Sequence, residues 1–310
     1  MKKTIAFLLA VSLILMSGCG AVKKNGKNGS VIAVSFYPVY IFTLNLVKGI
    51  DTVDVRCMAQ QNTGCLHDYT LTARDARLLN DADVFVICGA GMETFLDDLE
   101  ETTENLPVID SSVGIELLCG DSHEHEDEHG ETEHMGHSHE HSENSHIWMS
   151  VENAEKQVIN IKNGLLKVFP QYENEINANC EEYLERLGLL KTEIQSAGDC
   201  LKGENVITFH AAYDYASREI GFNVIATVES DEGGEPSAKE LARLCDEIRE
   251  NNVKALFIEP EYDGNAAQIL ATETGAEIYV LNPVVKGDGV LTAYEDIMRE
   301  NIDIMKKAVK

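Results

Sequence analysis

The chain has 310 residues and a formal net charge of −28, from 25 basic and 53 acidic side chains. Such an excess of negative charge argues against nucleic acid as a partner and favours cations, although an acidic surface also serves solubility alone. With 44% hydrophobic residues, the chain is long enough for two domains and a sizeable core.

Residues 1–18 have the pattern of a secretion signal. Two lysines precede the apolar run TIAFLLAVSLILMSG, which is short for a membrane span and ends in small residues before Cys19. The ending MSGC resembles a bacterial lipobox, with Met16 in place of the more usual Leu, in which the cysteine carries the lipid. We therefore expect an extracytoplasmic protein, lipid-anchored to the bacterial cell membrane, with residues 19–30 as a polar tether. A transmembrane anchor or an ordinary cleaved signal is the alternative.

Short apolar runs alternate with helical patterns along the rest of the chain. Strands are predicted at 31–36, 53–59, 83–89 and 107–110, with helices at 40–50, 72–80 and 92–101 between them. Two helical stretches follow with no strand between them, at 151–169 and 172–198. The alternation then resumes with strands at 205–210, 223–228, 255–260 and 277–283 and helices at 211–221, 237–252, 264–275 and 293–309.

This order predicts an α/β fold of two lobes with mostly parallel sheets, bridged by one long rigid helix. The N-terminal lobe would span residues 31–170, including a His-rich acidic loop at 121–145. The linking helix would span 171–199, and the C-terminal lobe 203–310. No sequence repeat between the two halves is visible.

Seven cysteines remain once Cys19 is set aside, an odd number with no CxxC pair, which argues against a cysteine-rich zinc module. Three of them fall in strand or helix patterns, where we expect buried and unreactive side chains: Cys88, Cys180 and Cys245. Cys57 and Cys65 could pair, and the sequence leaves that open. The other two are Cys119 and Cys200.

Eight of the ten histidines lie between His123 and His146. Residues 121–145 also hold nine acidic side chains and no Lys or Arg, so this segment cannot bury enough surface to fold alone. Neutral imidazole and carboxylate are both zinc ligands, but ordering a loop costs free energy, so we expect weak metal sites. These would use His123, His125, His129, His134, His137, His139 and His141. A hydrophilic insertion without function is the alternative.

Three further histidines are isolated in the sequence. His67 lies in a loop entering a helix, His146 follows the acidic loop, and His210 closes the strand NVITFH. Because ligands bind beyond the carboxyl ends of parallel strands, residues far apart in sequence can converge there. A single histidine at a strand end is more often structural, so the prediction of a site depends on the three together.

These histidines stand in motifs that resemble the zinc- and manganese-binding lipoproteins of ABC metal importers, the cluster A-I solute-binding proteins, over about residues 31–310. GCLHDYTLTARD resembles Gly-x-x-Pro-His-x-Tyr-x-x-Thr-Pro-x-Asp, with Leu66 and Ala73 replacing the prolines. NSHIW resembles Asp-Pro-His-x-Trp, and the segments EPSAKELARL and IEPEYD resemble parts of the second lobe. In TFHAAYDYASREIGF, His210 stands where zinc carriers have His and manganese carriers have Glu. The His-rich insertion is also typical of the zinc branch.

The resemblance implies that His67, His146 and His210 hold Zn²⁺ as transported ligand in the cleft between the lobes, for delivery to an ABC permease by a monomeric carrier. Three imidazoles suit tetrahedral Zn²⁺, whereas Mn²⁺ prefers oxygen. Asn282 departs from the pattern, because manganese carriers have Asp there. The fourth position is therefore expected to be water, a loop side chain or an amide contact, with Asn282 or Glu259 as a ligand or a group behind the ligands.

An enzyme is the alternative from another class. Three histidines and an open position also describe a catalytic zinc site, and Asp68, Glu229 or Glu259 could act as its general acid or base. No HExxH or nucleophile-elbow motif is present, so we expect no enzymatic activity. A secreted zinc-dependent hydrolase, a manganese carrier and a surface metal buffer or adhesin remain as alternatives.

Overall fold

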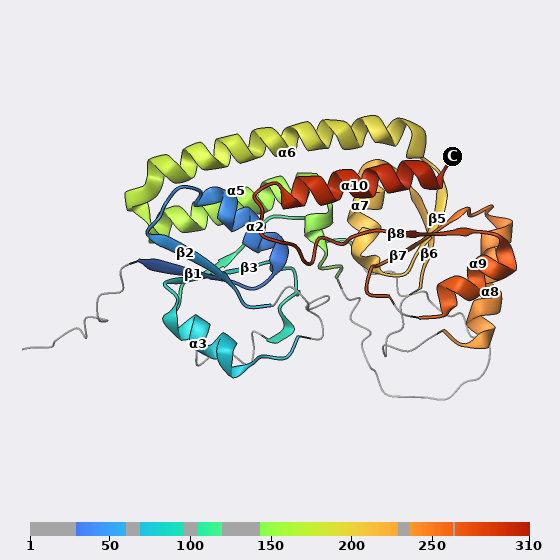
Figure 1. Cartoon of the computed structure of the whole chain (residues 1–310), viewed down its shortest axis with the longest axis horizontal. Helices are drawn as coiled ribbons and strands as arrows, with labels where there is room; N and C mark the ends of the chain where they lie inside the picture. The colour runs from blue at the N-terminus through green and yellow to red at the C-terminus, as the bar shows by residue number, and fades with distance from the viewer. Residues whose placement is uncertain (1–28, 60–68, 96–104, 120–142, 229–235, 263) are drawn as a thin grey trace, which may run out of the picture.

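The structure, a computed structural model, describes residues 29–59, 69–95, 105–119, 143–228, 236–262 and 264–310 (Figure 1). The predicted secretion signal, the predicted lipidation site Cys19 and the loop histidines His123 to His141 lie outside the described residues. No helix within the described ranges is long and apolar enough to cross a membrane.

Two four-stranded sheets, each with only parallel pairs, form the two lobes and confirm the predicted fold class. The first sheet has the order β2-β1-β3-β4, from β1 (Ser30–Val34), β2 (Val53–Cys57), β3 (Val84–Ile87) and β4 (Val108–Asp110). The second has the order β6-β5-β7-β8, from β5 (Asn205–Thr208), β6 (Asn223–Thr227), β7 (Ala255–Ile258) and β8 (Glu277–Val280). The two lobes thus repeat one strand order without a visible repeat in sequence.

The helices lie close to their predicted positions. The N-terminal lobe has α2 (Tyr37–Leu46), α3 (Ala73–Asp81), η3 (Ile147–Met149) and α5 (Val151–Val168). The turn η4 (Pro170–Tyr172) leads into the long helix α6 (Glu173–Leu201). The C-terminal lobe has η5 (Ala211–Tyr213), α7 (Asp214–Ile220), α8 (Ala238–Glu250), α9 (Ala266–Thr274) and α10 (Ala293–Ala308). The helix predicted at 92–101 falls largely outside the described residues, and the exact domain boundaries stay a prediction.

Local signals in the sequence explain several helix ends. At the start of α3, the Thr72 hydroxyl accepts from the Asp75 N–H while the Asp75 carboxylate accepts from the Thr72 N–H, a reciprocal capping box. The Ser237 hydroxyl caps α8 by accepting a hydrogen bond from the Glu240 N–H at 3.2 Å. These caps satisfy backbone N–H groups that have no partner inside a helix.

Helix α6 lies along the top of both lobes, with α10 beside it (Figure 1). It contacts α2 and α5 of the N-terminal lobe and α7 and α10 of the C-terminal lobe. Glu295 of α10 is buried and pairs with Arg186 of α6 at 3.3 Å. Asn45 of α2 donates to the Leu291 carbonyl at 2.9 Å, just before α10 begins. The last helix of the chain therefore returns to the first lobe.

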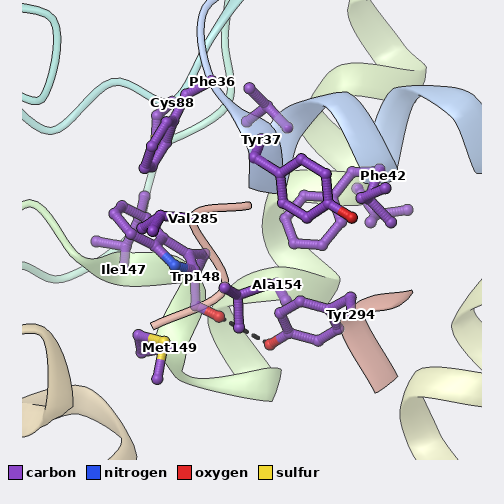
Figure 2. Close-up of a cluster of buried hydrophobic side chains, with 14 of the residues drawn as sticks. Phe36, Tyr37, Phe42, Cys88, Ile147, Trp148, Met149, Ala154, Val285 and Tyr294 are labelled. Carbon is purple, nitrogen blue, oxygen red and sulfur yellow. Dashed lines mark hydrogen bonds between the residues drawn. The ribbon is translucent and has the colours of Figure 1, made fainter. Parts of the chain in front are cut away.

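One hydrophobic core extends across the boundary between the lobes. Trp148, the single tryptophan of the chain, lies in it with 0% of its surface exposed. Phe36 packs edge-on against it, with ring centroids 5.0 Å apart. The Trp148 indole N–H donates to the Pro283 carbonyl at 2.8 Å. The Tyr294 hydroxyl donates to the Trp148 carbonyl at 2.7 Å (Figure 2). The lobes are therefore joined by shared packing as well as by α6.

We expect Trp148→Phe to lower the free energy of unfolding by about 1–3 kcal/mol, because the buried Pro283 carbonyl loses its donor and a cavity remains. Leu189→Ala is the control, since that side chain is 64% exposed and its removal should change stability by less than about 0.5 kcal/mol. Urea unfolding followed by circular dichroism measures both. Equal stability of the two variants would contradict a role for Trp148 in joining the lobes.

Candidate metal centre

Two of the three isolated histidines lie together at the lobe boundary. The rings of His146 and His210 are 4.5 Å apart between centroids and nearly perpendicular, at 85°. His146 comes from the N-terminal lobe and His210 from the C-terminal lobe, and only 4% of His146 is exposed. His67, the third predicted ligand, lies outside the described residues.

His210 lies at the lobe boundary because it follows strand β5, which ends at Thr208. The backbone of His210 is extended, at φ −164° and ψ 138°, and the residue precedes the short helix η5. It therefore sits beyond the carboxyl end of a parallel strand, as the sequence predicts, and its neighbours β6 and β7 end at the same edge of the sheet.

The Glu259 carboxylate, which follows the end of β7, contacts Nδ1 of His210. A carboxylate in this position accepts the Nδ1 proton, fixes the ring and leaves Nε2 as the nitrogen that binds metal. Burial, and then the nearby charge of Glu259, raises the pKa of Tyr213 well above its ordinary value. The Tyr213 phenol therefore stays protonated, and it donates to the Leu281 carbonyl at 2.6 Å.

His146 is held by the peptide segment around it, residues 144–151. Nδ1 of His146 lies 2.9 Å from the amide oxygen of Asn144, which also accepts from the His146 backbone N–H at 3.0 Å. At the other end of the segment, Glu219 of α7 accepts from the Val151 N–H at 2.8 Å. Burial, opposed by hydrogen bonds that include Val151, raises the pKa of the Glu219 carboxyl. Neither Asn144 nor Glu219 was predicted from the sequence as a residue of the site. For Asn144, the signal in the sequence was its position two residues before His146.

Asn282 lies in a turn after β8. Its backbone N–H, its backbone carbonyl and its side-chain oxygen each make a hydrogen bond. Its N–H donates to the Asn301 amide oxygen at 2.9 Å, and its carbonyl accepts from the Asn301 amide at 2.7 Å. Its side-chain oxygen accepts from the Val284 N–H at 2.9 Å. Val284 has φ +61°, a conformation rare for a β-branched residue. This geometry gives Asn282 a clear role in holding the turn, whereas its role as a metal ligand stays a prediction.

The structure describes only some of the other residues predicted for the site. Among the residues that the structure describes, no group of three or more His, Cys, Asp or Glu side chains could hold a metal ion. Asp68 and Glu229, the other candidate acid or base groups, lie outside those residues, as does His67.

The cysteines give no alternative site in the described part of the chain. Cys88, Cys180 and Cys245 are buried, as predicted. Burial raises the pKa of the Cys57 thiol to about 12, so it stays protonated and a poor metal ligand. Cys65 lies outside the described residues.

A cavity of about 790 Å³ lies beside β2 and α3 and is not suited to a cation. Three of the eight arginines of the chain line it: Arg56, Arg74 and Arg77. Guanidinium groups keep their positive charge at any physiological pH and repel a divalent metal ion. The histidine pair at the lobe boundary therefore stays the candidate metal centre.

We expect Asn282→Ala to lower the free energy of unfolding by about 1–3 kcal/mol, because the Val284 N–H loses its acceptor in a turn with positive φ. Asn282→Asp keeps an oxygen acceptor there and should lose less. Urea unfolding compares the two variants. If the alanine variant were as stable as the unchanged protein, the side-chain oxygen would not be holding the turn.

Comparison with known proteins places the chain in a family. Residues 32–308 match the family model described as "Zinc-uptake complex component A periplasmic". The high-affinity zinc uptake system protein ZnuA of Bacillus subtilis (strain 168) is 30% identical over 98% of this chain and 96% of its own length. The zinc-binding lipoprotein AdcA of Streptococcus pneumoniae serotype 4 is 29% identical over 100% of this chain, which spans 60% of that relative. A crystal structure of ZnuA matches with a TM-score of 0.76 and 25% identity, over 91% of this chain and 100% of that one. The chain belongs to the ZnuA family of zinc-uptake solute-binding proteins, which serve transport.

Proposed function

We propose that this protein captures Zn²⁺ outside the cytoplasm and delivers it to the permease of an ABC importer. The observation that carries the proposal is the meeting of His146 and His210 across the lobe boundary, each with an oxygen acceptor at Nδ1. Family membership and the zinc-uptake relatives support the same function. Enzymatic activity is not proposed, because the family serves transport and Glu259 is engaged with His210.

We propose His67, His146 and His210 as the zinc ligands, with Zn–N distances of about 2.0–2.1 Å. Imidazole nitrogens favour zinc over manganese, which prefers oxygen ligands. The contact of Glu259 with Nδ1 of His210 favours a role in orienting that ring over a role as fourth ligand. Asn282 is engaged in its turn, so water is the simplest fourth ligand.

Attachment to the membrane is proposed through a lipid on Cys19, with the signal at residues 1–18 removed. The family description is periplasmic, and one relative is named a lipoprotein. A monomeric carrier held by residues 19–30 could then reach a permease in the same membrane.

Zinc should raise the melting temperature of the protein strongly. A ligand that binds only the folded state adds RT ln(1 + [L]/Kd) to its stability, about 4 kcal/mol at a thousandfold excess over Kd. We expect His210→Ala to remove most of that rise, whereas the matched control His129→Ala, which removes an imidazole from the acidic loop, should keep it. Differential scanning calorimetry with and without zinc measures both. An unchanged thermal shift in His210→Ala would refute the ligand assignment.

The acidic loop should add weaker sites without building the tight one. We expect replacement of residues 121–142 by a short Gly-Ser linker to lower the number of bound zinc ions while leaving one tight site. The design keeps Cys119 and Glu143, which form an antiparallel bridge at the base of the loop. Native mass spectrometry gives the stoichiometry and calorimetry gives the affinity. Loss of the tight site with the loop would show that the proposed ligand set is wrong.

A further inference from the structure

The Asn144 side chain has four hydrogen-bond contacts and is 95% buried, with 5% of its surface exposed. Its oxygen lies 3.0 Å from the His146 backbone N and 2.9 Å from the His146 Nδ1. Its nitrogen donates to the Ala211 carbonyl at 2.8 Å and to the Asp214 carboxylate at 2.9 Å. A primary amide has two donor hydrogens and two acceptor lone pairs, so this arrangement uses its whole capacity.

These partners allow only one orientation of the amide. The Ala211 carbonyl and the Asp214 carboxylate can only accept, and the His146 backbone N–H can only donate. The amide oxygen must therefore face His146, and a hydrogen bond to it from Nδ1 requires the proton on Nδ1. Nε2 is then the nitrogen with a lone pair, the form in which imidazole binds a metal.

The same amide connects the two lobes beside the histidine pair. Ala211 and Asp214 belong to the turn and helix that directly follow His210. From this helix, the Tyr215 hydroxyl donates to the Asn144 carbonyl at 2.7 Å and accepts from the Leu118 N–H at 3.0 Å. Asn144 thus links the ring of His146 to the backbone that carries His210.

We propose that Asn144 is a positioning residue that fixes His146 in its Nδ1–H form and ties that ring to the turn of His210, and that a neutral amide is required there because Asp214 faces it. This inference rests on the proposed zinc site for its effect on affinity. The inferred proton position on His146 does not require metal.

Asp214 makes the proposal specific to an amide. A carboxylate at position 144 would lie within hydrogen-bond distance of the Asp214 carboxylate, with no hydrogen to place between them. The Ala211 carbonyl would also lose the hydrogen bond from position 144. Exchanging the two residues, as Asn144→Asp with Asp214→Asn, returns a donor to one side of the pair and an acceptor to the other. The exchange should therefore repair most of what Asn144→Asp breaks.

The test compares Asn144→Ala, Asn144→Asp and the exchanged pair Asn144→Asp/Asp214→Asn. Asn160→Asp is the matched control, because the Asn160 amide also donates to two carbonyls, those of Ser111 and Val113 just after β4. In metal-free protein, above the ordinary histidine pKa of about 6.5, two-dimensional ¹⁵N NMR of the imidazoles reports which nitrogen of His146 carries the proton. His146→Gln assigns the signal. Competition with a chromophoric chelator gives the zinc affinity.

We expect His146 to be in the Nδ1–H form in the unchanged protein and to become a tautomer mixture in Asn144→Ala. Asn144→Asp should weaken zinc binding by about 10–100-fold, the exchanged pair should recover most of that loss, and Asn160→Asp should match the unchanged protein. An Nε2–H form in the unchanged protein, a tautomer unaffected in Asn144→Ala, or an exchanged pair no better than Asn144→Asp would overturn the proposal. If the unchanged protein held no zinc at all, the proposed function would fail, while the NMR comparison would still decide the role of Asn144.

Discussion

Burial of Trp148 between the lobes is the constraint on which the histidine pair depends. The indole packs against Phe36 of one lobe and donates to the Pro283 carbonyl of the other, and Tyr294 of the last helix donates to its carbonyl. Separating the lobes would expose this core and break those buried hydrogen bonds. His146 lies two residues before Trp148, so its backbone position is fixed by the same packing.

The segment 144–151 belongs to the N-terminal lobe by sequence, yet most of its hydrogen bonds to other segments are made with the C-terminal lobe. At one end of the segment, Glu219 accepts a hydrogen bond from the Val151 N–H. At the other end, Asp214 and Tyr215 are hydrogen-bonded to Asn144. His210 stands on the same side of the boundary as these partners. A metal ion held by this pair would meet rings that are already oriented, and little binding free energy would be needed to order them.

The two histidines differ in the group behind each ring. Glu259 gives His210 a carboxylate acceptor, whereas Asn144 gives His146 a neutral amide acceptor. Two carboxylates behind two adjacent rings would add negative charge to a buried place that already contains Asp214 close by. The amide supplies the same orientation without that charge. Although the chain has a net charge of −28, the side chain that contacts Nδ1 of the His146 ring is therefore neutral.

The sequence by itself determined the alternation of strands and helices, the parallel sheets, the long helix α6 and the family motifs, because these depend on local periodicity and on residues close together in the chain. It also placed His210 beyond the end of a strand. Only the tertiary structure decided the shared core around Trp148, the return of α10 to the first lobe and the roles of Asn144 and Asn282. Each of those depends on partners brought together from separate segments, such as Trp148 with Pro283, and no pattern of spacing in the sequence specifies which donor will face which acceptor after folding.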